Sequence, residues 1–132
     1  MIIPTPLPAA GLAVPLRAAF QVFKRWPLIG VASNNLNPSL VLHGDGVEYN
    51  LVKHRRRSYA DVEMVDARQW VGGHDIIFHW RGAFFASRMN LAQADWLPQL
   101  LGFFSDKGCL LSTPAREILA GAQAVSKSAN GR

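Results

Sequence analysis

Residues 39–108 have the sequence SLVLHGDGVEYNLVKHRRRSYADVEMVDARQWVGGHDIIFHWRGAFFASRMNLAQADWLPQLLGFFSDKG and form the most strongly patterned part of this 132-residue chain. Short apolar segments alternate with turn residues, and His43-Gly44-Asp45-Gly46 is typical of a tight β-hairpin turn. Large apolar residues near the end recur at helical spacing: Trp96, Leu97, Leu100, Leu101, Phe103 and Phe104. The pattern predicts a meander of strands closed by a C-terminal helix.

Five segments are candidate strands. Leu40–Leu42 and Val47–Leu51 flank the first turn, and the second of them alternates apolar and polar residues, which is typical of a strand with one wet face. Ile76–Trp80 and Ala83–Met89 predict a second hairpin around an Arg-Gly turn. Tyr59–Val65 has a mixed period, so a strand and a single helical turn both stay open there.

Two helices are expected after the strands. Asn90 and Asp95 are both candidate caps of the first, and Asp95 is preferred because Pro98 then falls in the first turn. Lys107 lies in its expected last turn and Gly108 just beyond it. The second has Thr113 as its cap and Pro114 at its first helical position, and it gives way to a frayed Ser/Ala/Gly-rich tail over residues 121–132.

Composition predicts one ordered domain with a local basic patch. Hydrophobic residues make up 49% of the chain and charged residues 17%, which suits a packed core. The net charge is +5, and four of the 14 Lys and Arg residues lie within residues 53–57. The only cysteine, Cys109, allows no intramolecular disulfide and no cysteine zinc site, which fits a reducing cytoplasm and a buried thiol without a function.

The N-terminal segment is uncharged up to Arg17. It has no positive charge before its apolar part, and four prolines interrupt it, so we expect neither a signal peptide nor a membrane span. Residues 1–8 are expected to form an extended tail. After Pro15, apolar residues recur at helical spacing and basic residues fall elsewhere, predicting a short amphipathic helix that ends before Pro27 and includes Leu16, Arg17, Ala19, Phe20, Phe23, Lys24 and Arg25. Such a helix packs on the domain or on a partner copy, or lies on an anionic membrane.

Two sequence elements carry a family resemblance. At Leu40–Val47 an apolar strand leads through an Asp-Gly turn into another strand, and Ser58–Val62 has the pattern Ser-Tyr-x-Asp-Val. Together with the Leu- and Phe-rich closing helix, they make residues 39–108 resemble the bacterial pleckstrin-homology-like domains, including the YcxB-like group. The resemblance implies a bent antiparallel sheet, a partial barrel with a helix at one open end, and recognition of lipids, phosphoinositides or peptides.

The expected fold is therefore α+β and mostly β. Residues 1–35 form a tail and a short helix, residues 36–110 the pleckstrin-like core with its closing helix, and residues 111–132 a short helix and a frayed tail. The sequence departs from the family in two ways. YcxB-like proteins usually carry transmembrane helices before the domain, whereas this chain has only the short stretch Leu16–Trp26 there. Fewer strands are expected here than in a full pleckstrin domain, whose first strand is either missing here or lies around Leu28–Ala32.

The basic cluster is the sharpest candidate site. It consists of Lys53, His54, Arg55, Arg56 and Arg57. On a loop between two strands, these side chains suit charge-assisted hydrogen bonds to phosphate. A solvated loop that guards an edge strand is the alternative. Nucleic acid is disfavoured, because no aromatic platform is interleaved with the cluster and no nucleic-acid-binding motif accompanies it.

Enzymatic and metal functions are not expected. The four histidines are His43, His54, His74 and His79. The last two lie five residues apart, so along one strand they point to opposite faces and do not share a ligand set. Paired carboxylates, a nucleophile elbow, a phosphate-binding glycine loop and a dinucleotide fingerprint are all missing from the sequence. We expect no catalytic residue, no metal and no cofactor.

The aromatic residues predict an apolar outer face. Adjacent Phe84 and Phe85 point to opposite sides if they belong to a strand, and Phe78 and Trp80 share a face opposite Ile77. A small domain normally covers such a face with a helix or a second copy, so we expect a homo-oligomer.

The sequence thus predicts a cytoplasmic, non-catalytic pleckstrin-like module, peripheral to the inner membrane if lipid is its partner. Its expected partner is a protein or a polyanion such as a phospholipid head group. Two alternatives stay open: a membrane-surface accessory protein acting through its N-terminal helix, and a small-ligand-binding barrel.

Overall fold

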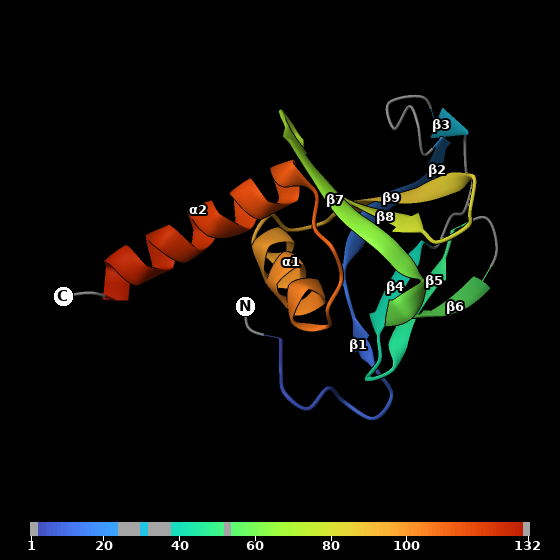
Figure 1. The fold of residues 1–132 in the computed structure, drawn as a ribbon, viewed down its shortest axis with the longest axis horizontal. Coiled ribbons are helices and arrows are strands. Elements are labelled where there is room, and N and C mark those ends of the chain that lie inside the picture. Colours follow the sequence, from blue (N-terminus) through green and yellow to red (C-terminus); the bar gives the residue numbers. More distant parts are fainter. Residues whose placement is uncertain (1–2, 24–29, 32–37, 52–53, 131–132) are drawn as a thin grey trace.

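The computed structural model describes residues 3–23, 30–31, 38–51 and 54–130. Two antiparallel sheets and two helices make up this part of the chain, so the fold is α+β and mostly β (Figure 1). Within the described ranges the sheets stay separate and form no closed barrel. None of the described helices is long and apolar enough to cross a membrane.

The first sheet has the strand order β1 (Leu12–Ala13), β4 (Ser39–Leu42), β5 (Gly46–Asn50), β6 (His54–Ser58). The expected hairpin joins β4 to β5, and the His43 N–H donates to the Gly46 carbonyl at 2.8 Å. Gly46 also sets how closely β5 approaches β6. A Cβ at this position would lie 2.1 Å from the Arg57 carbonyl oxygen, which only glycine avoids.

The second sheet has the order β3 (Gly30–Val31), β2 (Leu16–Phe23), β9 (Phe85–Leu91), β8 (Gly73–Trp80), β7 (Val62–Trp70). The hairpin expected between β8 and β9 is confirmed. For Tyr59–Val65 the sequence leaves a strand and a single helical turn open, and the structure contains both, one after the other. Tyr59–Asp61 forms one 3-10 turn, and β7 begins directly after it at Val62.

The prediction of an N-terminal amphipathic helix is wrong for the residues of it that the structure describes. Leu16–Phe23 is strand β2, which pairs with β9 from Leu16 opposite Leu91 to Phe23 opposite Phe85. The ladder to β9 supplies the backbone hydrogen bonds, and this tertiary pairing outweighs the helical spacing of the apolar residues. Lys24, Arg25 and the side chain of Phe23 lie outside the described residues.

The sheets pack face to face around an aromatic stack. The Trp80 ring lies parallel to Tyr49 of the first sheet with centroids 5.0 Å apart, and it stacks on Phe78 at 5.3 Å. Phe104 meets Phe78 edge to face at 5.0 Å. This stack joins the two sheets to the first helix and forms the centre of the core.

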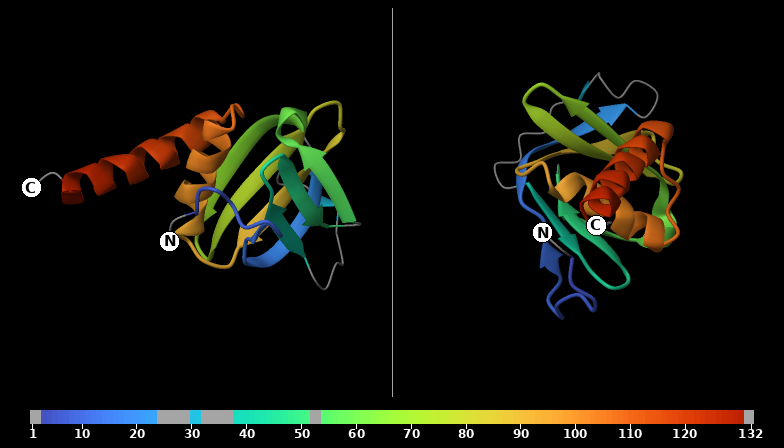
Figure 2. Two further views of the ribbon diagram at one scale, coloured as in Figure 1. Left: turned by 90° about the horizontal axis from the view of Figure 1, so that it is seen from below. Right: turned by 90° about the vertical axis from the view of Figure 1, so that its left-hand side faces the viewer.

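Helix α1 (Trp96–Asp106) closes one end of the sheets, as expected (Figure 2). Its core-facing side chains are fully buried: Leu97, Leu100, Leu101 and Phe104. Asp95 occupies the N-cap position but makes no side-chain cap hydrogen bond. Gly108 has φ +85° just past the helix, a left-handed stop that suits glycine.

Helix α2 (Thr113–Asn130) is longer than the sequence predicts and projects away from the sheets (Figure 1). The prediction of a frayed tail from residue 121 is wrong up to Asn130, where the chain is helical. The alanines and the glutamine of residues 121–130 favour helix over coil. The cap is Ser112 rather than Thr113, because Ser112 Oγ accepts the Ala115 N–H at 3.2 Å. The same hydroxyl donates to Asp66 Oδ1 at 2.6 Å and fixes the start of α2 on β7.

The outer face of the second sheet is partly apolar, as expected from Ile77. Val22, Ile77 and Ala86 form a small cluster there that is buried within a single chain. Phe20, which lies opposite Arg88 on the same face, is 41% exposed. The homo-oligomer stays a prediction.

Candidate functional site

The basic cluster lies on a strand, not on the loop expected from the sequence. His54–Ser58 form β6, which pairs with β5 from Asn50 opposite His54 to Gly46 opposite Ser58. Lys53 lies outside the described residues. Three consecutive arginines suit this position because β6 is the last strand of its sheet, where charge discourages unwanted pairing.

The strand divides the basic cluster between two faces. Arg57 lies opposite Val47 and Arg55 opposite Tyr49, on the side of the sheet that faces the core. His54 and Arg56 lie on the other side with Glu48. The cluster is therefore two separate sites with different partners.

The inward Arg57 is held by aromatic groups. Its Nε donates to the Tyr49 hydroxyl at 2.9 Å, and its guanidinium carbon lies 5.1 Å from the centroid of the Trp80 ring. Trp80 is fixed in turn, because its Nε1 donates to Ser87 Oγ at 2.8 Å. A cation over the face of an indole is attracted by the ring quadrupole, so Arg57 is oriented before any ligand arrives.

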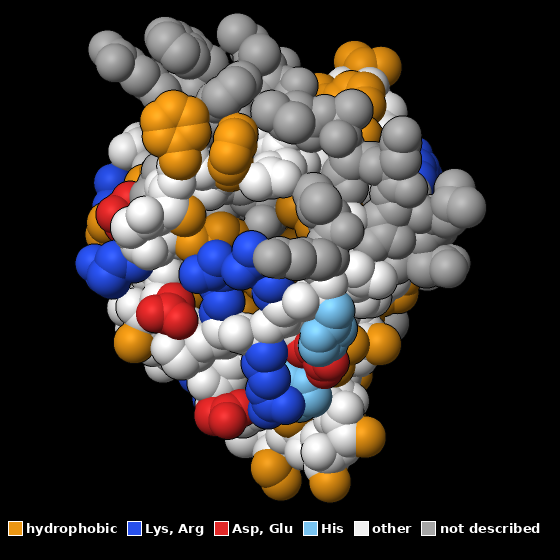
Figure 3. Space-filling view, turned by 90° about the vertical axis from the view of Figure 1, so that its right-hand side faces the viewer, with side chains coloured by type: hydrophobic (Ala, Val, Ile, Leu, Met, Phe, Trp, Pro, Cys, Tyr) orange, Lys and Arg blue, Asp and Glu red, His pale blue; other side chains and the backbone are white. Residues whose placement is uncertain are grey.

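Arg55 and Arg57 line a pocket of about 280 Å³. It lies between β6 and the turn from β8 to β9, and Tyr49, Trp80, Phe84 and Ser87 contribute to its wall. Seen from the side opposite the helices, Lys and Arg side chains lie in a hollow with hydrophobic side chains beside them (Figure 3). The volume is near the lower limit for ligand pockets and suits a small charged group.

The pocket arginines have no carboxylate partner among the described residues. Other arginines of the protein do. Arg56 Nη2 pairs with Asp45 at 2.9 Å, and this hydrogen bond lowers the pKa of Asp45. Arg88 Nε pairs with Asp75 at 2.7 Å. The two inward arginines thus place uncompensated positive charge in a pocket.

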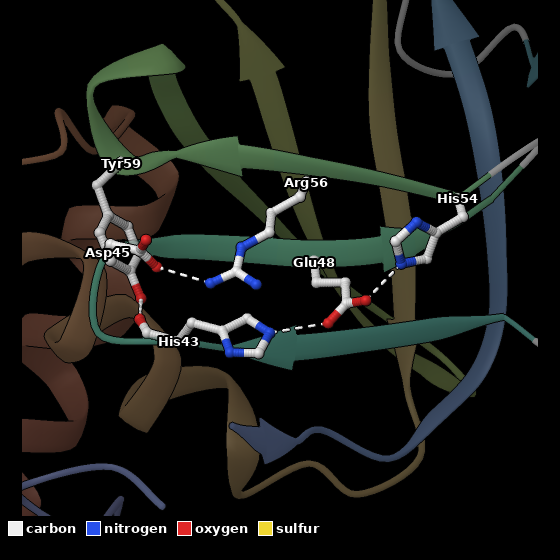
Figure 4. Close-up of polar contacts among 6 residues, drawn as sticks. All are labelled: His43, Asp45, Glu48, His54, Arg56 and Tyr59. Atoms are coloured by element: carbon white, nitrogen blue, oxygen red, sulfur yellow. Dashed lines mark hydrogen bonds and ion pairs between the residues drawn. The ribbon is translucent and has the colours of Figure 1, made fainter. Parts of the chain in front are cut away.

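The outward face carries a cluster centred on Glu48 (Figure 4). One carboxylate oxygen bonds to His43 Nε2 at 2.8 Å, and the other bonds to His54 Nε2. The hydrogen bond to His43, followed by that to His54, lowers the pKa of Glu48. Tyr59 donates its hydroxyl to the His43 carbonyl and ties this hairpin to α1 through edge contacts with Phe103 and Phe104.

We expect protonation of Glu48 to cause a small loss of stability in acid. Its pKa is lower in the folded chain than the usual 4.5, so its contribution is complete above about pH 4.5 and disappears as pH falls through the folded value. We expect the urea midpoint of Glu48→Gln to fall less than that of the wild type between about pH 5 and pH 3. Equal slopes for the two proteins in this window would contradict the prediction.

Among the described residues, neither the Cys109 thiol nor a metal-ligating group forms a second site. Cys109 is buried, and its burial raises the pKa of the thiol, so it stays protonated near neutral pH. In the part of the chain that the structure describes, no group of three or more His, Cys, Asp or Glu side chains is placed to hold a metal ion.

Sequence reasoning identified the basic residues of the pocket but missed its aromatic wall. Pairing of β5 with β6 brings Tyr49 to Arg57, and the stacking of Tyr49 on Trp80 of the other sheet brings the indole ring there as well. Period-two alternation across the hairpin was the available signal. It places Tyr49 opposite Arg55 and separates Arg56 from its two neighbours, once the segment is taken as a strand.

No family model matches the chain, and no characterised protein or solved structure is significantly similar to it. The pleckstrin-like resemblance stays a prediction.

Proposed function

We propose that this protein is a non-catalytic binding module that recognises an anionic group at the pocket holding Arg55 and Arg57. One observation carries the proposal: both arginines face the pocket, and no described carboxylate pairs with either of them. Two like charges beside a partly enclosed, aromatic-walled space repel each other unless an anion joins them. A phosphate or carboxylate group would supply that compensation.

The donors of Arg57 support recognition of such a group. Its Nε is engaged by Tyr49, which leaves both Nη groups to donate. A guanidinium fork matches the spacing of phosphate or carboxylate oxygens and can bind two of them at once. Because Trp80 and Tyr49 already orient the side chain, little rotamer entropy is lost on binding.

The pocket lining supports binding rather than catalysis. Its described wall contains no carboxylate, histidine or cysteine that could act as a base or a nucleophile. The membrane-surface alternative loses its described basis, because the helix on which it relied is strand β2. The small-ligand alternative gains support from the pocket itself and shares the same arginines.

Arg57 and Arg56 provide a matched test, since they are neighbours on opposite faces. We expect the Arg55→Ala/Arg57→Ala variant to bind pyrophosphate at least about tenfold more weakly, because hydrogen bonds to charged groups contribute about 1.5–3 kcal/mol each. Arg56→Ala should bind as the wild type does, because Arg56 is directed away and paired with Asp45. Titration calorimetry measures both.

Vesicles distinguish the source of the anion. Phosphatidylserine in phosphatidylcholine should sediment the wild type in a salt-sensitive way only if a lipid head group occupies the pocket. Equal weakening of pyrophosphate binding by Arg56→Ala and by the double variant would show that general surface charge, not the pocket, binds the anion.

A further inference from the structure

Strand β6 is an open edge of the first sheet beside the pocket. It comes last in the strand order and pairs only with β5 among the described residues. No hydrogen bond joins the other side of its backbone to the described chain. Alternate N–H and C=O groups along His54–Ser58 are therefore available to an added strand.

A second copy of this chain is a poor match for that edge. Antiparallel pairing of two β6 strands about Arg56 would place Arg55 of each copy opposite Arg57 of the other, and the two Arg56 side chains opposite each other. Like charges directly across a strand pair are destabilising. The edge rejects its own copy and favours a strand that carries negative charge.

We infer that an extended acidic peptide adds to β6 as a further strand of the first sheet and directs alternate carboxylates to Arg55 and Arg57. The inference rests on the proposed anion recognition and names its partner class. Side chains two residues apart on a strand lie on one face about 6.6 Å apart, a spacing that both strands share. Acidic residues at every second position would therefore meet the two pocket arginines in register.

The neighbouring residues suit such a peptide. Phe84, at the turn from β8 to β9, is 73% exposed at the pocket and lies edge to face with Phe85 at 5.4 Å, so it offers apolar surface to a peptide side chain. On the outer face, Arg56 is already paired with Asp45. The peptide residues between the acidic ones need no negative charge.

The test uses a short capped peptide in which glutamate alternates with valine, and two control peptides. One carries N-methyl groups on the backbone nitrogens that would face β6, which removes the pairing and keeps the charge. The other has glutamine in place of glutamate. We expect each control to bind the full-length protein at least about tenfold more weakly than the parent peptide. Amide hydrogen exchange along His54–Ser58 should slow with the parent peptide only.

The outcomes separate the inference from the proposed function. Equal binding of the N-methylated peptide, unprotected β6 amides or no peptide binding at all would overturn the edge-strand inference. So would equal binding of the glutamine peptide, or binding to anionic vesicles alone. The proposed function would still stand in each case if pyrophosphate binding needs Arg55 and Arg57 but not Arg56, and it would fall if that dependence is missing.

Discussion

Replacing Asp75 by alanine is expected to lower the free energy of unfolding by about 3–5 kcal/mol. Asp75 is 3% exposed and accepts three hydrogen bonds, from Arg88 Nε at 2.7 Å, Asn90 Nδ2 at 2.7 Å and Trp70 Nε1 at 3.1 Å. Alanine removes the acceptor from all three donors at once. The largest loss comes from Arg88, whose side chain is only 15% exposed.

The Arg88 partner provides the control for this prediction. If uncompensated charge causes the loss, the double variant Asp75→Ala/Arg88→Met should be more stable than Asp75→Ala alone, because the arginine is then also removed. Urea unfolding of the wild type, both single variants and the double variant gives the coupling energy. A loss below about 1 kcal/mol for Asp75→Ala would mean that water replaces the carboxylate.

The strands and hairpins near the centre of the chain were predictable because their signals are local. The Gly-Asp-Gly turn and the alternation of Val47–Leu51 both lead to the hairpin that the structure contains. The closing helix was predictable as well, since its apolar face and its stop at Gly108 lie within one segment. In each of these elements the conformation that the local sequence favours is the one found in the fold, so no distant partner is needed to predict it.

Two segments were misassigned because their conformation depends on a distant partner. The helical spacing from Leu16 to Phe23 is real, but β9 offers a ladder to this segment, and β9 lies more than sixty residues away. The basic cluster carries no strand signal except its pairing with β5. Propensity and periodicity describe a segment alone, and they fail where tertiary pairing determines the backbone.

The candidate site was predictable in its charge and not in its walls. Counting charges is enough to find the arginines, whereas the pocket needs the two sheets to stack Tyr49 on Trp80. The same stack is part of the core, so the recognition surface and the centre of the fold share residues. A substitution at this point should therefore change stability and binding together.

Trp80→Ala should show that double effect, with a loss of about 3–5 kcal/mol in the free energy of unfolding. Trp80 is 2% exposed, stacks on Tyr49 and on Phe78, and donates to Ser87. The truncation leaves a cavity between the sheets and removes the ring under Arg57. Thermal or urea unfolding measures the first effect, and pyrophosphate titration measures the second.

Two milder variants separate packing from the cation–π contact, and they keep the prediction testable if Trp80→Ala does not fold. Trp80→Phe keeps an aromatic face under Arg57, whereas Trp80→Leu keeps apolar volume without that face. The cation–π contact contributes about 1 kcal/mol, so Trp80→Leu should bind pyrophosphate about fivefold more weakly than Trp80→Phe. Equal affinities in the two folded variants would show that Tyr49, rather than the indole ring, orients Arg57 for its ligand.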